Sequence, residues 1–219
     1  MTAESKEPNQ PFDSFFEPYA REIGFLLRNW NDMQERLADL FSTLVSPHDL
    51  SLARAVWYAI PNDRWQRQML KTVSDHLFQS DSIDHQTFRA EIDWIIEKAN
   101  SLGGQRDAAA HAPVGMLLDE PYEFIAAQLR GNPAAKRLAG KRLIDEFRLC
   151  RRRAIVLRDH AATMTDYFRE GIGRWTWPKR PEWPSSQRSR VEKSRMMQEE
   201  GRSPQRRSQP GQGRRSKRK

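Results

Sequence analysis

Arg106 and His111 are the two residues whose types and spacing come closest to a chemical site in this chain. They lie in the stretch GGQRDAAAHAP, residues 103–113, with four residues between them and Asp107 directly after the arginine. A guanidinium can hold a phosphate through charge-assisted hydrogen bonds. An imidazole titrates near neutral pH and can act as a general base. The pair therefore raises the question of a nuclease site.

The setting of this pair resembles the HEPN families of small helical domains, whose motif is Arg-x4–6-His, commonly with Asn after the arginine. Arg106, Asp107 and His111 occupy the motif positions, and the similarity covers roughly residues 15 to 170. The resemblance implies metal-independent RNA cleavage, in which His111 takes the proton from a ribose 2′-hydroxyl and Arg106 holds the scissile phosphate. Asp107 departs from the usual Asn, and its carboxylate would repel a phosphate. The resemblance thus covers both an active ribonuclease and an inactive relative that only binds.

A single helix does not bring the two side chains together. Five helical positions separate them by about 140° around the axis and about 7.5 Å along it. The resemblance implies that two copies pair, so that His111 and Arg106 of facing helices converge. A homodimer built on long helices is therefore part of the catalytic hypothesis.

The alternative interpretation gives both residues a structural role. Arg106 continues an apolar stripe, so its charged end would reach out from the edge of that stripe and pair with Asp107 or another acid. His111 would then stand at a helix C-terminus, where the partial negative charge favours an imidazolium.

Apolar periodicity predicts the elements that must position these residues. A helix over 14–45 is indicated by apolar residues in steps of three and four, namely Ile23, Leu26, Trp30, Met33, Leu37, Leu40 and Leu44. A short helix over 50–60 stops at Pro61, and the next begins at an Asn/Asp cap with Trp65, Met69, Val73 and Leu77 as its stripe. The helix that leads to Arg106 carries Phe88, Ile92, Ile95, Ala99 and Leu102.

Two further patterns complete the fold class. The stretches PVGMLL and YEFIAAQL predict a small β-hairpin near 113–131, after the firm boundary at Pro113. A final helix follows a regular 4-3 spacing, with a seam that must pack against a helix of the same chain or of another: Leu143, Phe147, Cys150, Ala154, Leu157, Ala161, Met164 and Phe168. We expect a mainly α protein, an antiparallel helical bundle with a small β-hairpin insertion and a disordered basic C-terminal tail.

Charge is unevenly distributed along the 219 residues. From Gly171 onward, 15 Lys and Arg stand against 4 Asp and Glu, a net charge of +11, whereas the first 170 residues carry a net charge of −3. We therefore divide the chain into a flexible arm (1–13), a helical domain (14–170), an extended Trp/Pro-rich segment (171–184) and a disordered tail (185–219). The Trp residues Trp175, Trp177 and Trp183 should pack back over the helices.

The basic tail is a candidate for sequence-independent nucleic-acid binding, since Lys and Arg release counterions from phosphate backbones. The residues we expect to bind are Arg206, Arg207, Arg214, Arg215, Lys217, Arg218 and Lys219. The opposing interpretation is a tail that only confers solubility.

Cysteine content and hydropathy exclude several classes of protein. Cys150 is the only cysteine, which rules out an intramolecular disulfide and a cysteine-based zinc site. The histidines show no ligand spacing, and we expect neither a metal nor a cofactor. The sequence begins without a secretory signal pattern and has no window of 18 apolar residues, so we expect a cytoplasmic protein that does not enter a membrane.

Three functional hypotheses remain. The first is a HEPN-like RNA-associated protein, either a metal-independent ribonuclease or a relative that only binds. The second is a non-enzymatic helical interaction or dimerisation protein that uses the 143–168 seam, with a tail that binds nucleic acid non-specifically. The third is a DNA-associated accessory protein attached through the tail.

Overall fold

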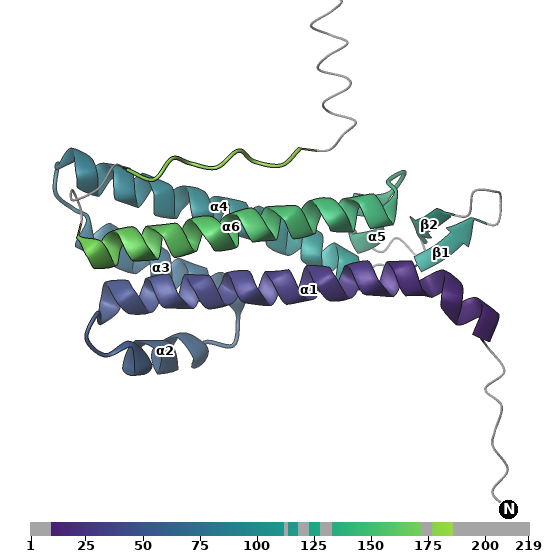
Figure 1. Ribbon diagram of the computed structural model, residues 1–219, viewed down its shortest axis with the longest axis horizontal. Coiled ribbons are helices and arrows are strands. Elements are labelled where there is room, and N and C mark those ends of the chain that lie inside the picture. The colour runs from purple at the N-terminus through teal and green to yellow at the C-terminus, as the bar shows by residue number, and fades with distance from the viewer. Residues whose placement is uncertain (1–9, 112–113, 118–122, 128–132, 172–176, 186–219) are drawn as a thin grey trace, which may run out of the picture. The chain divides into compact units, whose positions relative to one another are not determined.

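Long helices dominate the computed structural model, which describes residues 10–111, 114–117, 123–127, 133–171 and 177–185. Within these ranges the helices are α1 (Gln10–Val45), α2 (Leu50–Tyr58), α3 (Asp63–Leu77), α4 (Ile83–His111), α5 (Pro133–Leu138) and α6 (Leu143–Glu170). The two strands are β1 (Val114–Leu117) and β2 (Glu123–Ala126), and they pair antiparallel (Figure 1). The expected helical bundle with a small hairpin is confirmed.

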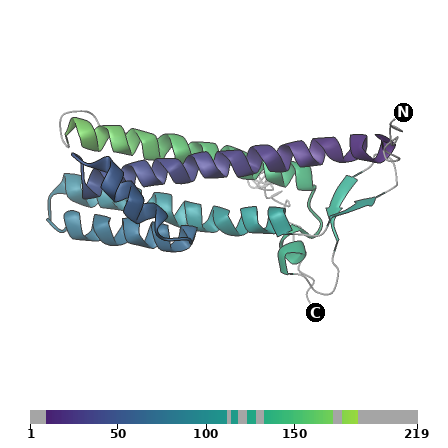
Figure 2. The same cartoon turned by 90° about the horizontal axis from the view of Figure 1, so that it is seen from below.

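Helices α1, α4 and α6 form the centre of the bundle. Tyr19 and Phe147, each in the first third of its helix, lie 5.4 Å apart between ring centroids, so α1 and α6 run in the same direction. Phe88 near the start of α4 lies 5.7 Å from Phe168 near the end of α6, so α4 runs the opposite way. Figures 1 and 2 show these three helices side by side over most of their length.

The stripe predicted for α1 is its buried face. Its members Leu26, Met33, Leu37 and Leu40 are fully buried, and Trp30 and Leu44 are nearly so. The helix begins at Gln10, inside the segment expected to be a flexible arm, and it continues through Pro18. Proline removes one backbone donor and crowds the preceding turn, which bends a helix. Figure 1 shows such a bend in the N-terminal part of α1.

The stripes predicted for α4 and α6 are also buried. All five apolar residues predicted for α4, from Phe88 to Leu102, have no exposed surface. On α6, every seam residue from Leu143 to Met164 is at most 2% exposed, and Phe168 packs against the same core. This seam lies against α1 and α4 of its own chain. It is therefore occupied within the chain rather than presented to a partner.

Half of the stripe predicted for α3 is confirmed, because Met69 and Val73 pack against the core. Its other two members, Trp65 and Leu77, are exposed, at 66% and 41%, while the buried positions of this helix include Gln66, Arg67 and Leu70. The side chain of Gln66 can be buried because its amide donates hydrogen bonds to the carbonyl oxygens of Trp57 and Ile60, at 3.2 and 2.8 Å. Polar side chains that satisfy backbone groups thus displaced the apolar ones from the buried face. The expected cap holds, because Asn62 accepts from the amide of Arg64 at 2.8 Å.

The hairpin and α5 stand at one end of the bundle. β1 and β2 pair from Val114 opposite Ala126 to Leu117 opposite Glu123. Phe124 of β2 packs on Phe16 and Tyr19 of α1, with ring centroids 5.3 Å apart in both cases. Helix α5 was not predicted, and it returns the chain from the hairpin to the start of α6. The boundary between two compact units falls after Pro184.

The buried seam of α6 gives a stability test. Leu157→Ala removes a side chain with no exposed surface and should lower the free energy of unfolding by about 2–5 kcal/mol. Leu52→Ala makes the same change at a position that is 62% exposed, and the free energy should stay within about 0.5 kcal/mol. Urea unfolding of both variants measures the difference, and equal effects would contradict the packing of α6.

Candidate functional site

Gly103 and Gly104 do not interrupt α4, which continues through them to His111. A Cβ added at Gly103 would lie 3.3 Å from the ring of Trp30 on α1. A Cβ added at Gly104 would lie 2.8 Å from Nη1 of Arg137 on α5. Glycine costs about 1 kcal/mol in a helix interior relative to alanine. Here the two glycines allow side chains from two other helices to approach the backbone of α4.

Arg106 is held inside its own chain. Its Nη2 lies 2.9 Å from Oδ2 of Asp63 on α3, and its Nε lies 3.2 Å from Oδ1 of Asp107. The guanidinium also stands 4.8 Å from the centre of the Trp30 ring, in cation–π geometry. Two carboxylates and an indole thus surround a side chain that is 26% exposed. This is the pairing with Asp107 or another acid that the structural interpretation described.

Asp63 joins three helices through one oxygen. Asp63 is the first residue of α3. Its Oδ2 accepts a hydrogen bond from Nη2 of Arg106 at 2.9 Å and another from the indole Nε1 of Trp30 at 3.1 Å. A second guanidinium, Arg67, lies on the same indole at 5.6 Å and donates to Oδ1 of Asn100 on α4 at 2.8 Å. We call Trp30, Asp63, Arg67 and Arg106 the Trp30 cluster.

Arg67 is the member of the Trp30 cluster that sequence reasoning missed. It is only 4% exposed, and burial lowers the pKa of its guanidinium to about 10. Because an arginine on a helix is usually solvated, neither the residue type nor the spacing of Arg67 predicted its burial. Its position relative to Trp30 comes from the crossing of α1 and α3, which no local pattern encodes.

His111 lies apart from Arg106. It is the exposed last residue of α4, and the helix is continuous between the two positions. Because the helix neither bends back nor breaks, one chain does not bring the two side chains onto a shared phosphate. Asp107 is 57% exposed and points its charge toward Arg106. A joint site of Arg106 and His111 would need a second copy of the chain, and that part of the hypothesis stays a prediction.

A second polar cluster joins α4, α6 and the segment 177–185. Glu91 of α4 accepts two hydrogen bonds from Arg180, at 3.1 and 2.7 Å, and lies 3.1 Å from Nε2 of His160. Glu91 and His160 are buried, at 7% and 4% exposure. Trp94 covers the group, with His160 and Arg180 both against its ring. A buried carboxylate therefore gains its counter-charge from a segment outside the helices.

Segment 177–185 is extended and packs over α4 and α6, as Figure 1 shows. The expected packing is confirmed for two tryptophans: Trp177 lies against Phe88 and Tyr167, and Trp183 lies between Lys98 and Arg153. Trp175 lies outside the described residues. Arg153 also donates to the carbonyl oxygen of Pro184 at 3.0 Å. The chain is therefore anchored on α6 immediately before the basic tail begins.

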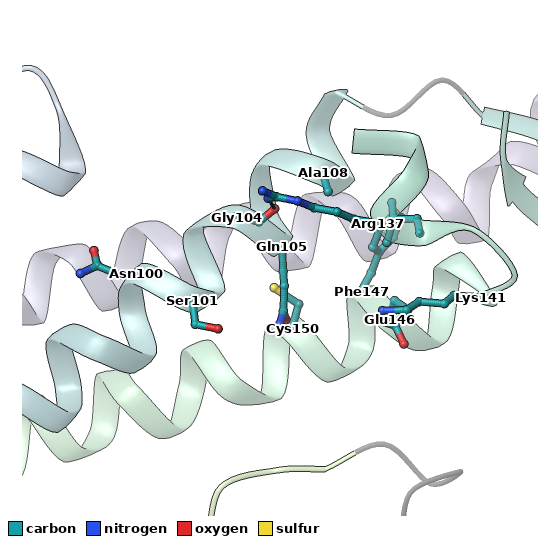
Figure 3. A pocket seen from close by; sticks show the side chains of 11 residues that line it. Asn100, Ser101, Gly104, Gln105, Ala108, Arg137, Lys141, Glu146, Phe147 and Cys150 are labelled. Atoms are coloured by element: carbon teal, nitrogen blue, oxygen red, sulfur yellow. Dashed lines mark hydrogen bonds and ion pairs between the residues drawn. The ribbon is translucent and has the colours of Figure 1, made fainter. Parts of the chain in front are cut away.

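A pocket of about 500 Å³ opens between α4, α5 and α6 (Figure 3). Side chains from the three helices point into the same space, with Gln105 of α4 reaching toward Cys150 of α6. Buried residues Ala108, Leu138, Phe147 and Cys150 form its apolar wall. Arg137 and Lys141 lie at its exposed side. No sequence pattern marked this pocket, because one of its sides comes from the unpredicted α5 and the loop after it.

Cys150 is the chain's single thiol and lies in the wall of this pocket at 2% exposure. Burial raises the pKa of the thiol to about 12. Since the thiolate is the reactive form, this environment makes Cys150 a poor nucleophile at neutral pH.

Several sequence expectations concern features outside these clusters. The seven tail residues expected to bind nucleic acid, from Arg206 to Lys219, lie outside the described residues. Disorder was expected for residues 185–219, and all of these but Ser185 also lie outside the described residues. Among the residues that the structure describes, no group of three or more His, Cys, Asp or Glu side chains is arranged to hold a metal ion. None of the described helices has the length and apolar character needed to cross a membrane.

The role of Asp63 in the Trp30 cluster can be measured directly. Asp63→Ala removes the acceptor of both Arg106 and Trp30 and should lower the free energy of unfolding by about 1–2 kcal/mol, given the partial exposure of the pair. Asp107→Ala removes the more exposed partner of Arg106 and should cost less than about 0.5 kcal/mol. Thermal or urea unfolding compares the two, and a larger loss for Asp107→Ala would refute this assignment.

The burial of Cys150 predicts its reactivity. At pH 8 the fraction of thiolate should be on the order of a thousandfold lower than for a thiol with the ordinary pKa, so labelling of the folded protein should be slower by a similar factor. The measurement is the rate of alkylation in buffer and in urea, followed by intact mass, with the unfolded chain as the control. Rapid labelling of the folded protein would show that the thiol is accessible.

Comparisons of the chain with protein-family models, with curated proteins and with solved structures find no match, so the geometry above carries the functional argument.

Proposed function

We propose that this protein is a nucleic-acid-binding helical protein that performs no chemistry of its own, with RNA as the ligand that its HEPN resemblance favours. The observation that carries this proposal is the engagement of Arg106. Its guanidinium is paired with Asp63 and Asp107 and lies on Trp30, so two carboxylates already balance its charge. A catalytic role would require Arg106 to leave two carboxylates and then act beside them.

The distribution of charge supports binding through the tail. The folded part is slightly acidic, whereas the last 49 residues carry the net charge of +11. A chain of this kind attracts phosphate backbones at its basic end only, without reading base sequence. The contacts of Arg153 with Pro184 and with the Trp183 ring hold the start of that basic end against α6.

The tail hypothesis is tested in the full-length chain by replacing all seven C-terminal basic residues, Arg206 to Lys219, with glutamine. Binding to single-stranded RNA should weaken strongly at low salt, and the slope of log Kd against log salt should fall by about 0.7 for each phosphate that the tail no longer neutralises. The double variant Lys136→Gln and Arg169→Gln removes exposed charge from the folded part and should bind nearly as the wild type does. Unchanged binding by the tail variant would refute the proposal, and equal binding of DNA would point to a DNA-associated role.

The absence of catalysis is tested with labelled RNA in EDTA, comparing the wild type with His111→Ala. We expect no difference between the two proteins, because Arg106 is engaged and His111 stands apart from it. His111 is exposed at the helix end, so its substitution should leave stability unchanged. Cleavage by the wild type that His111→Ala abolishes would establish the ribonuclease instead, and a second-order dependence on protein concentration would then indicate the dimer.

A further inference from the structure

The pocket between α4, α5 and α6 has an apolar interior. Ala108, Leu138, Phe147 and Cys150, all at most 6% exposed, make up its wall. Its volume of about 500 Å³ falls within the range of about 300–1,000 Å³ that is usual for small-molecule sites. An apolar wall of this size can cover a flat ring system.

The opening of the pocket is cationic. Arg137 and Lys141 line it, and Glu146, paired with Lys141 at 3.0 Å, provides one carboxylate. Arg137 donates through Nη1 to the carbonyl oxygen of Gly104 at 3.2 Å. A guanidinium has five N–H donors, so this contact orients Arg137 and leaves donors that can form a fork with a phosphate.

Amide side chains supply a third kind of group. Asn100 and Gln105 of α4 line the pocket, and each has a fixed partner: Asn100 accepts from Arg67, and Gln105 accepts from Arg153 at 3.1 Å. Of the two, Gln105 reaches into the pocket, and because its oxygen accepts that hydrogen bond, its NH2 group remains as a donor. Donors of this kind can bind ring nitrogens and carbonyl oxygens on the edge of a base.

The pocket therefore combines an apolar wall, a guanidinium at its exposed side and the amide of Gln105. We propose that this pocket binds a nucleoside monophosphate unit, with its base against the apolar wall and its phosphate at the Arg137 guanidinium. The unit can be a free nucleotide or one unpaired nucleotide of a bound strand, and only the second source rests on the proposed function.

Calorimetric titration of the full-length protein tests the site with four probes: 5′-mononucleotides, the corresponding nucleosides, inorganic phosphate and a short single-stranded oligonucleotide. We expect mononucleotides to bind at least about tenfold more tightly than either nucleoside or phosphate, since only they engage both halves of the pocket. If phosphate alone binds as tightly as a mononucleotide, the pocket is only a cation cluster and the proposal is wrong.

Two neighbouring residues of α5 provide a matched pair of variants. Arg137→Gln should weaken mononucleotide binding by about tenfold or more, whereas Lys136→Gln, an equal loss of charge outside the pocket, should leave it within about twofold. Gly104→Ala should also weaken binding, because the added Cβ displaces Arg137, while the helix becomes no less stable. Equal losses for Arg137→Gln and Lys136→Gln would show non-specific attraction and overturn the assignment.

The tail variant with seven glutamines separates this site from the proposed function. If that variant still binds mononucleotides and loses the oligonucleotide, the tail holds the strand and the pocket is a true site. If the wild-type tail proves inactive toward RNA but Arg137-dependent mononucleotide binding persists, the pocket takes a free nucleotide and the proposed function fails alone. Absence of any Arg137-dependent binding refutes the pocket site, whatever the tail does.

Discussion

The arrangement of α1, α3 and α4 depends on the contacts that the indole of Trp30 makes with the other two helices. Its nitrogen bonds to Asp63, its ring lies against Arg67 and Arg106, and its edge approaches the backbone of α4 where Gly103 leaves space. A buried aromatic group with a polar atom fixes orientation as well as depth, because the hydrogen bond is made in one geometry only. The three helices therefore meet in a defined register.

Helix α4 contributes to both polar clusters and to the pocket. One face carries the apolar stripe, while its other positions contribute Arg106 to the Trp30 cluster, Glu91 to the contact with Arg180, and Gln105 to the pocket. Each of these polar residues forms its hydrogen bonds or ion pairs with a different element, so that buried charges are paired. The same pairing engages the Arg106 guanidinium within the chain, and this favours binding through the basic end of the chain over catalysis by the helix.

Much of the fold follows from local pattern. Local pattern predicted the stripes of α1, α4 and α6 and the hairpin. Burial of one face repeats apolar residues every three to four positions in a helix and every two in a strand. The stripe of α3 was half right: Met69 and Val73 pack against the core, whereas Trp65 is exposed. Gln66 and Arg67 are buried instead because they donate hydrogen bonds to the Ile60 carbonyl and to Asn100. Helix α5 is six residues long and carries too few positions to show any period.

The sequence by itself determined where the long helices lie, where the positive charge lies, and that Arg106 and His111 stand five positions apart. Only the tertiary structure decided what those residues do. Asp63, the partner of Arg106, lies 43 positions away, and Gly104 lies 33 positions from Arg137, so neither contact leaves a local signature. The pocket exists because helices from three parts of the chain converge on it, and such convergence depends on packing angles that side-chain periodicity does not specify.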